Sequence, residues 1–163
     1  ALYFKPGYGL ELLRNEILGS ERFDYAFRTY IEKWAFKHPT PWDFFRTMDN
    51  ASGEDLSWFW RGWFMENYKL DQAILGVKYE NDDPAQGAVV TIANLDQMAM
   101  PVNVSYETKS GKKGRLRLPV EVWNNRDETK LRVPVNEELA RIDLDPDKIL
   151  PDMNATNNTW RSK

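Results

Sequence analysis

The spacing of apolar residues changes once along this chain of 163 residues, from a helical repeat to a strand repeat. Up to residue 68 the apolar residues recur every three or four positions, which is the period of a helix with one buried face. After residue 73 they alternate with polar residues, which is the period of a half-buried strand. The order of the two periods predicts an α+β chain with a helical array first and a β-sandwich second.

The first two predicted helices adjoin at a glycine. Leu10, Leu13 and Ile17 recur with helical spacing, and Gly19 provides a C-terminal stop. Ser20 is the predicted N-cap of the second helix. The second helix gathers large apolar side chains on one face, which we expect to be buried: Phe23, Phe27, Tyr30, Ile31 and Trp34.

Start signals mark the third and fourth predicted helices. Thr40 is the predicted N-cap of the third, with Pro41 at the first helical position and Asp43 in the acidic place of a capping box. Ser52 is the predicted N-cap of the fourth. We expect core packing, rather than a sugar-stacking platform, for the apolar stripe of the fourth helix: Leu56, Phe59, Trp60, Trp63 and Phe64.

Alternation in the second half predicts the strands of an antiparallel sandwich. The alternating sets are Leu75, Val77 and Tyr79; Val102, Val104 and Tyr106; Leu116, Leu118, Val120 and Val122; and Leu131, Val133 and Val135. Pro119 predicts an edge strand or a bulge, because proline has no N–H to donate to a ladder. The predicted boundaries are residues 1–70 for the helices, 71–150 for the sandwich and 151–163 for a tail pinned by Trp160.

Composition excludes several classes of function. The net charge is −3 with both signs interspersed, so we expect no nucleic-acid partner, and no apolar run is long enough for a membrane segment. The absence of cysteine excludes disulfides and thiolate catalysis. The single histidine, His38, has no companion at ligand spacing, so we expect no metal site and no cofactor within this chain.

The helical half carries short elements that resemble, in order and spacing, one family of enzymes. The elements are Tyr3-Phe4-Lys5, Leu18-Gly19, Phe23, Tyr30, Thr40 with Asp43 and Phe44, and Ser52-Gly53 with Leu56, Phe59 and Trp63. Over residues 2–68 they resemble the late catalytic-domain segment of the aminopeptidase-N-like zinc metallopeptidases, the gluzincin aminopeptidases. The second half is similar to the β domain that follows the catalytic domain in many members, and its sequence resembles that of the bacterial branch.

The resemblance implies that this chain is the C-terminal part of a zinc metallopeptidase that removes residues from peptide N-termini. In the family, zinc is bound by an H-E-x-x-H motif and a further Glu, and the motif Glu is the general base. The tyrosine of the Tyr-x-Lys element stabilises the tetrahedral oxyanion, and this role falls on Tyr3. The H-E-x-x-H motif and the amine-binding segment are absent here, and Pro6-Gly7 after the Lys departs from the Lys-Gly of many relatives.

These implications define the expected partners and one alternative. We expect the chain to be inactive alone, with zinc in the parent enzyme, and its partners to be the rest of the catalytic domain and the peptide substrate. An exposed apolar patch around Leu10 and Leu13 would support this. The alternative is a non-enzymatic binding or scaffold module whose interaction surface is the sandwich. The bacterial resemblance is the basis for expecting a periplasmic or cell-surface location.

Two charged segments have a structural interpretation. Residues 143–148, "DLDPDK", have alternating aspartates but lack the glycine and the terminal glutamate of an EF-hand, so they predict a turn. Residues 109–117, "KSGKKGRLR", predict a solvated basic hairpin tip. His38 precedes a proline in the connection between two helices, where a loop hydrogen bond is expected.

Overall fold

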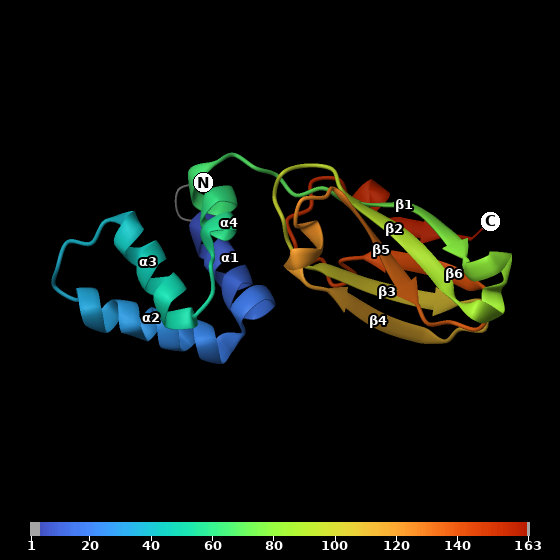
Figure 1. Ribbon diagram of the computed structural model, residues 1–163, viewed down its shortest axis with the longest axis horizontal. Coiled ribbons are helices and arrows are strands. Elements are labelled where there is room, and N and C mark those ends of the chain that lie inside the picture. Colours follow the sequence, from blue (N-terminus) through green and yellow to red (C-terminus); the bar gives the residue numbers. More distant parts are fainter. Residues whose placement is uncertain (1–3, 163) are drawn as a thin grey trace. The chain divides into compact units, whose positions relative to one another are not determined.

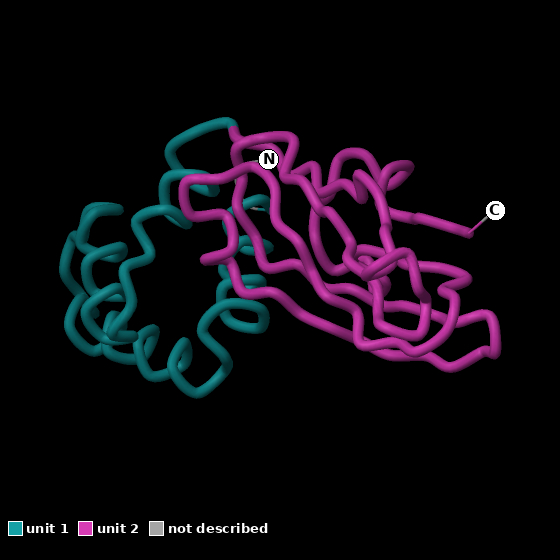
Figure 2. Tube along the Cα trace, turned by 45° about the vertical axis from the view of Figure 1, so that its right-hand side comes forward, with its two compact units in different colours: residues 1–67 teal, residues 68–163 magenta. Residues whose placement is uncertain are grey.

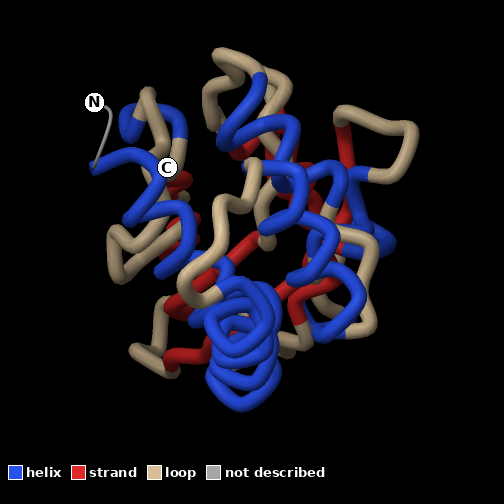
Figure 3. The backbone as a smooth tube through the Cα atoms, turned by 90° about the vertical axis from the view of Figure 1, so that its left-hand side faces the viewer, coloured by secondary structure: helices blue, strands red, loops and turns tan. Residues whose placement is uncertain are grey.

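The computed structural model describes residues 4–162, and the chain divides into two compact units, residues 1–67 and 68–163 (Figure 2). The α-helices of the described residues belong to the first unit and the strands to the second (Figures 1 and 3). This arrangement confirms the predicted α+β fold, with helices first and two antiparallel sheets second. No helix among the described residues is long and apolar enough to cross a membrane.

The helical unit contains four α-helices, two of which continue as π-helical segments. The elements are α1 (Phe4–Leu12) followed by η1 (Leu13–Leu18), α2 (Ser20–Trp34), α3 (Pro41–Ser52), and α4 (Ser57–Trp60) followed by η2 (Arg61–Met65). Gly19 separates η1 from α2 with a φ of +80°, as the predicted stop requires. Ser20, however, is the first residue of α2 and not its N-cap, because Gly19 holds the cap position.

The capping box of α3 is confirmed, whereas the predicted cap of the fourth helix is wrong. Thr40 Oγ1 accepts from the Asp43 amide at 3.4 Å, and Asp43 Oδ2 accepts from the Thr40 amide at 2.9 Å. Ser52 is the last residue of α3, because Gly53 ends that helix in the left-handed conformation, with a φ of +71°. The first amide of α4 is instead bound by the carboxylate of Asp55.

Burial follows the predicted stripe of α4 and departs from that of α2. Phe59, Trp60 and Trp63 are buried, as predicted. On α2, Phe23 is buried but Ile31 is 49% exposed, while the small Ala26 beside that face is fully buried. The buried side of α2 is therefore rotated away from the side that its large residues indicated.

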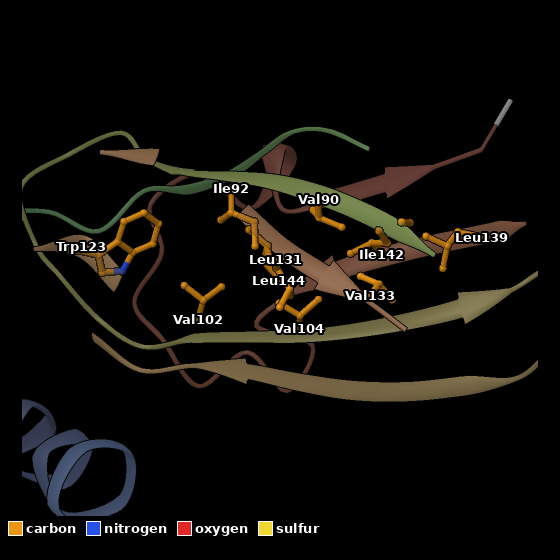
Figure 4. Packing of buried hydrophobic residues seen from close by; sticks show 11 residues of the cluster. Val90, Ile92, Val102, Val104, Trp123, Leu131, Val133, Leu139, Ile142 and Leu144 are labelled. Atoms are coloured by element: carbon orange, nitrogen blue, oxygen red, sulfur yellow. The ribbon is translucent and has the colours of Figure 1, made fainter. Parts of the chain in front are cut away.

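Two antiparallel sheets form the second unit. One has the order β1-β2-β5, with β1 (Gln72–Tyr79), β2 (Ala88–Asn94) and β5 (Glu128–Val133). The other has the order β4-β3-β6-β7, with β4 (Lys113–Leu118), β3 (Val102–Thr108), β6 (Leu139–Leu144) and β7 (Thr159–Arg161). Figure 4 shows side chains of β2 and β5 facing those of β3 and β6, so the core lies between the sheets.

Two differences from the predicted strands have local causes. A register shift between Ile74 and Gly76 leaves Leu75 as an extra residue on β1, and its side chain is 52% exposed instead of buried. The set that begins at Leu116 ends as a strand at Leu118, because Pro119 is followed by a short 3-10 helix, Val120–Trp123. The prediction of an edge strand there is confirmed, since β4 is at the edge of its sheet.

Strands β2 and β6 were not predicted, although each lies inside its sheet between two partners. The buried residues of β2 include the small Ala88, and those of β6, Leu139, Ile142 and Leu144, are unevenly spaced, which weakens both patterns. Trp160 lies on β7 and packs against the sandwich core, so the predicted anchor of the C-terminal segment is confirmed.

The capping box provides a test of the helical unit. Thr40→Ala is expected to lower the free energy of unfolding of this unit by about 1 kcal/mol, because an amide of the first turn loses its acceptor. Thr40→Ser keeps the hydroxyl and should retain most of the stability. Urea unfolding followed by tryptophan fluorescence measures both, and equal losses in the two variants would contradict the role of the hydroxyl.

Candidate functional site

Tyr3, the predicted catalytic residue, lies outside the described residues, and α1 is the described element that follows it. Lys5, Pro6 and Gly7, which follow Tyr3 in the sequence, all lie inside α1. Pro6 is tolerated because amides in the first turn of a helix have no carbonyl partner within that helix. The described part of the candidate site therefore consists of α1 and the elements that contact it.

Helix α1 rests on an aromatic side chain of η2. The ring of Tyr8 contacts that of Trp63 edge-on, with the centroids 6.3 Å apart, and the neighbouring Gly9 is buried against Trp63. Trp63 in turn stacks on Phe59, with the centroids 5.7 Å apart and an interplanar angle of 27°. The start of α1 is thus supported by the aromatic core of the helical unit.

A second contact holds η1, the continuation of α1. Arg14 donates from Nε and Nη2 to the two carboxylate oxygens of Asp24 on α2, at 2.7 and 2.9 Å. This bidentate hydrogen bond from Arg14 holds the pKa of Asp24 below its usual range. Both groups are partly exposed, so solvent screens the pair and its main effect is geometric.

Asp49 has the opposite electrostatic environment. Its carboxylate accepts from Trp60 Nε1 at 2.8 Å and from the backbone amide of Leu56. Burial raises the pKa of Asp49 and the nearby charge of Asp55 adds to the rise, while the two hydrogen bonds oppose it. A raised carboxyl pKa is typical of functional sites. Here both hydrogen bonds join α3 to α4, so the arrangement is that of a structural clamp.

No metal centre forms within the described residues. In the span 4–162, no group of three or more His, Asp or Glu side chains could hold a metal ion. His38 is exposed in the connection between α2 and α3, and its expected loop hydrogen bond stays a prediction.

The basic hairpin adopts the structure that the sequence predicted, whereas the predicted turn at residues 143–148 is shorter, because Asp143 and Leu144 belong to β6. In the turn that follows β6, the carboxylate of Asp145 accepts from the amides of Ile149 and Leu150, at 3.0 and 2.8 Å. The basic hairpin joins β3 to β4, and its side chains pair with acidic ones: Lys109 with Glu138, Lys112 with Glu137, and Arg115 with Asp147. These pairs place an acidic side chain beside three of the five positive side chains of the segment.

The alternative function needs an interaction surface on the sandwich, and one hollow lies on the sheet that contains β3. Its walls are formed by Ser105, Tyr106, Glu107, Lys113, Gly114, Arg115, Arg141 and Asp143. Across the hollow, Arg141 binds Asp143 at 2.6 Å and Lys113 lies 3.6 Å from Glu107. Charges that are paired within the surface favour a solvated face over a ligand site.

Sequence reasoning missed two residues that shape the helical unit. Gly9 carries a usable signal, because a glycine inside a helical pattern indicates close packing. Asp49 carries none, since its role depends on Trp60 and Leu56, which reach it only in the folded chain.

The comparisons with known proteins show the fold alone. No protein-family model matches the chain, and neither does any curated protein. Among solved structures, the chain is similar to the crystal structure of Legionella pneumophila aminopeptidase A in complex with aspartic acid, with a TM-score of 0.62 and 17% identity. The similarity covers 89% of this chain and 16% of that chain. The chain therefore has an aminopeptidase-like fold, and it corresponds to only a short part of the aminopeptidase it resembles.

The clamp at Asp49 predicts a pH dependence of stability. Because the folded-state pKa of Asp49 is raised, the folded protein binds more protons than the unfolded one between the unfolded pKa, about 3.9, and the folded value. The contribution of Asp49 to stability therefore falls as the pH rises through this window. Asp49→Asn keeps an acceptor without a charge, so its stability relative to wild type should improve from pH 4 to pH 7.

Asp49→Ala is the matched variant. It leaves Trp60 Nε1 and the Leu56 amide without an acceptor and should cost about 1–3 kcal/mol at pH 7. Urea unfolding at several pH values measures all three proteins. An Asn variant as unstable as the Ala variant, with no change between pH 4 and 7, would contradict the clamp.

Proposed function

We propose that this chain is the last part of a gluzincin catalytic domain and the β-sandwich after it, from a zinc-dependent aminopeptidase of bacterial type. The observation that carries the proposal is the similarity to aminopeptidase A, which extends over 89% of the chain and so includes both units. The order of the family-like elements, from Tyr3-Phe4-Lys5 to Ser52-Gly53, supports the same assignment. The parent enzyme would hydrolyse the N-terminal peptide bond of a peptide.

In this proposal Tyr3 stabilises the oxyanion of the tetrahedral intermediate. A phenol suits the role because it is neutral at pH 7, with a reference pKa of about 10, yet donates a strong hydrogen bond. Helix α1, which follows Tyr3 in the chain, contacts Trp63 through Tyr8 and Gly9. The described residues do not fit a zinc site, so zinc would be bound by other segments of the parent, and the chain alone would be inactive.

The helical unit also has a surface suited to the rest of a catalytic domain. The predicted patch around Leu10 and Leu13 is absent, since Leu13 is fully buried and Leu10 half-buried. The exposed large apolar residues of the described part of this unit are Phe4, Tyr8, Tyr25, Phe27, Ile31, Phe36, Trp42 and Met65. The unit exposes far more of them than the sandwich, which exposes Leu75, Leu95 and Met153. We take this surface as the contact region for the remaining catalytic domain.

The test uses the full-length protein that contains this sequence. With aminoacyl-7-amido-4-methylcoumarin substrates, we expect hydrolysis when the amine is free and none when it is acetylated. Tyr3→Phe should lower kcat by a factor of about 10²–10³, because the oxyanion loses a donor. Tyr106→Phe, on β3 of the sandwich and outside this contact region, is the control and should leave kcat unchanged.

Zinc removal gives an independent test. Treatment with 1,10-phenanthroline should abolish the activity of the full-length protein, and added Zn²⁺ should restore it. The 163-residue chain alone should bind no zinc in a calorimetric titration. A full-length protein without chelator-sensitive hydrolysis would overturn the proposal and leave the binding module, with the sandwich as its interaction surface.

A further inference from the structure

Helix α1 contains a glycine at an interior position, where alanine would be more favourable by roughly 1 kcal/mol. The backbone of Gly9 is not in the left-handed region, so its conformation does not require glycine. The atoms around Gly9, however, leave no room for a side chain. A Cβ at Gly9 would lie 3.0 Å from Cε3 and 3.2 Å from Cδ2 of Trp63, which is closer than side chains normally pack. The backbone of α1 therefore sits directly on the indole ring.

The ring of Trp63 has little freedom to move away. Trp63 is 4% exposed and stacks on Phe59, which is fully buried. Its Nε1 is buried without an acceptor in the described part of the chain, so shape, and not a hydrogen bond, defines the contact. Trp63 also lies in the π-helical segment η2, and α1 passes into the π-helical η1, which is a feature frequent at functional sites.

Gly7 provides an internal comparison on the same helix. A Cβ added at Gly7 would meet no atom within 4 Å, so alanine there has open space. Two glycines two residues apart on α1 thus have different surroundings, since Gly7 is exposed and Gly9 is buried against Trp63.

We propose that Trp63 is a positioning residue that, through Gly9, sets the place of α1, the helix that follows Tyr3 in the chain. The catalytic part of this inference rests on the proposed function, whereas the contact itself does not. An oxyanion donor must be held within about 0.5 Å of its productive place, so a shift of a few tenths of an ångström at Gly9 would matter for the reaction.

The contact is tested first by stability. Gly9→Ala should lower the urea midpoint of the chain although alanine favours helix, whereas Gly7→Ala should raise it or leave it unchanged. In a Trp63→Leu background, Gly9→Ala should lose its cost or become stabilising. A stabilising effect of Gly9→Ala in the wild-type background, equal to that of Gly7→Ala, would overturn the proposal.

Amide hydrogen exchange measures whether α1 is displaced, residue by residue. This measurement needs only the glycine variants, so it remains possible if Trp63→Leu does not fold. In Gly9→Ala, the amides of residues 7–9 should exchange at least ten times faster than in wild type, and those of α3 should not change. In Gly7→Ala, both sets should keep their wild-type rates. Unchanged exchange in Gly9→Ala would show that α1 is not displaced and would contradict the positioning role.

The effect of the Gly9–Trp63 contact on catalysis is measured in the full-length enzyme. Gly9→Ala should lower kcat at least tenfold with KM within a factor of two, and it should have no further effect in a Tyr3→Phe background. An unchanged kcat, despite lost stability, would restrict Trp63 to packing and refute its catalytic role. If the wild-type protein shows no aminopeptidase activity, the proposed function fails and the catalytic part with it, while stability and exchange still decide the contact.

Discussion

Aromatic packing in the helical unit is the interaction on which its other elements depend. Isolated helices shorter than about 12 residues are marginal in water, and α4 has only four residues before it becomes π-helical. Such a segment is stable because Trp60 stacks on Phe45 of α3, with ring centroids 4.8 Å apart. In addition, Nε1 of Trp60 donates a hydrogen bond to the carboxylate of Asp49 on α3. Trp63, one turn later, then forms the surface on which α1 rests. The short helices are thus held by rings of other elements, α4 by Phe45 of α3 and α1 by Trp63 of η2.

The second unit is stabilised in a different way. Its core is the layer between two antiparallel sheets, to which alternate residues of each strand contribute (Figure 4). Charged side chains remain outside and pair with one another, as Arg132 of β5 does with Glu80 and Lys112 with Glu137. Because these pairs are exposed, they add little stability, and their main effect is to keep the charges of the outer faces balanced.

These features bear on how catalytic work would be divided in a larger enzyme. The described residues contain no set of metal ligands, while the helical unit holds the helix that follows Tyr3. An oxyanion donor and a metal that come from separate segments must be brought together by packing between those segments. The exposed aromatic residues of the helical unit, such as Phe4 and Phe27, are suited to that packing.

By itself, the sequence determined the features that depend on neighbouring residues. The change of period near residue 70, the capping box at Thr40 and the buried stripe around Trp60 follow from local spacing and local hydrogen bonds, and all are present. Only the tertiary structure decided the bulge that exposes Leu75, because register depends on a partner strand. It also decided the close contact of Gly9 with Trp63, which joins residues far apart in the chain. Periodicity indicates which face of an element is buried, but long-range packing selects the residue that meets it.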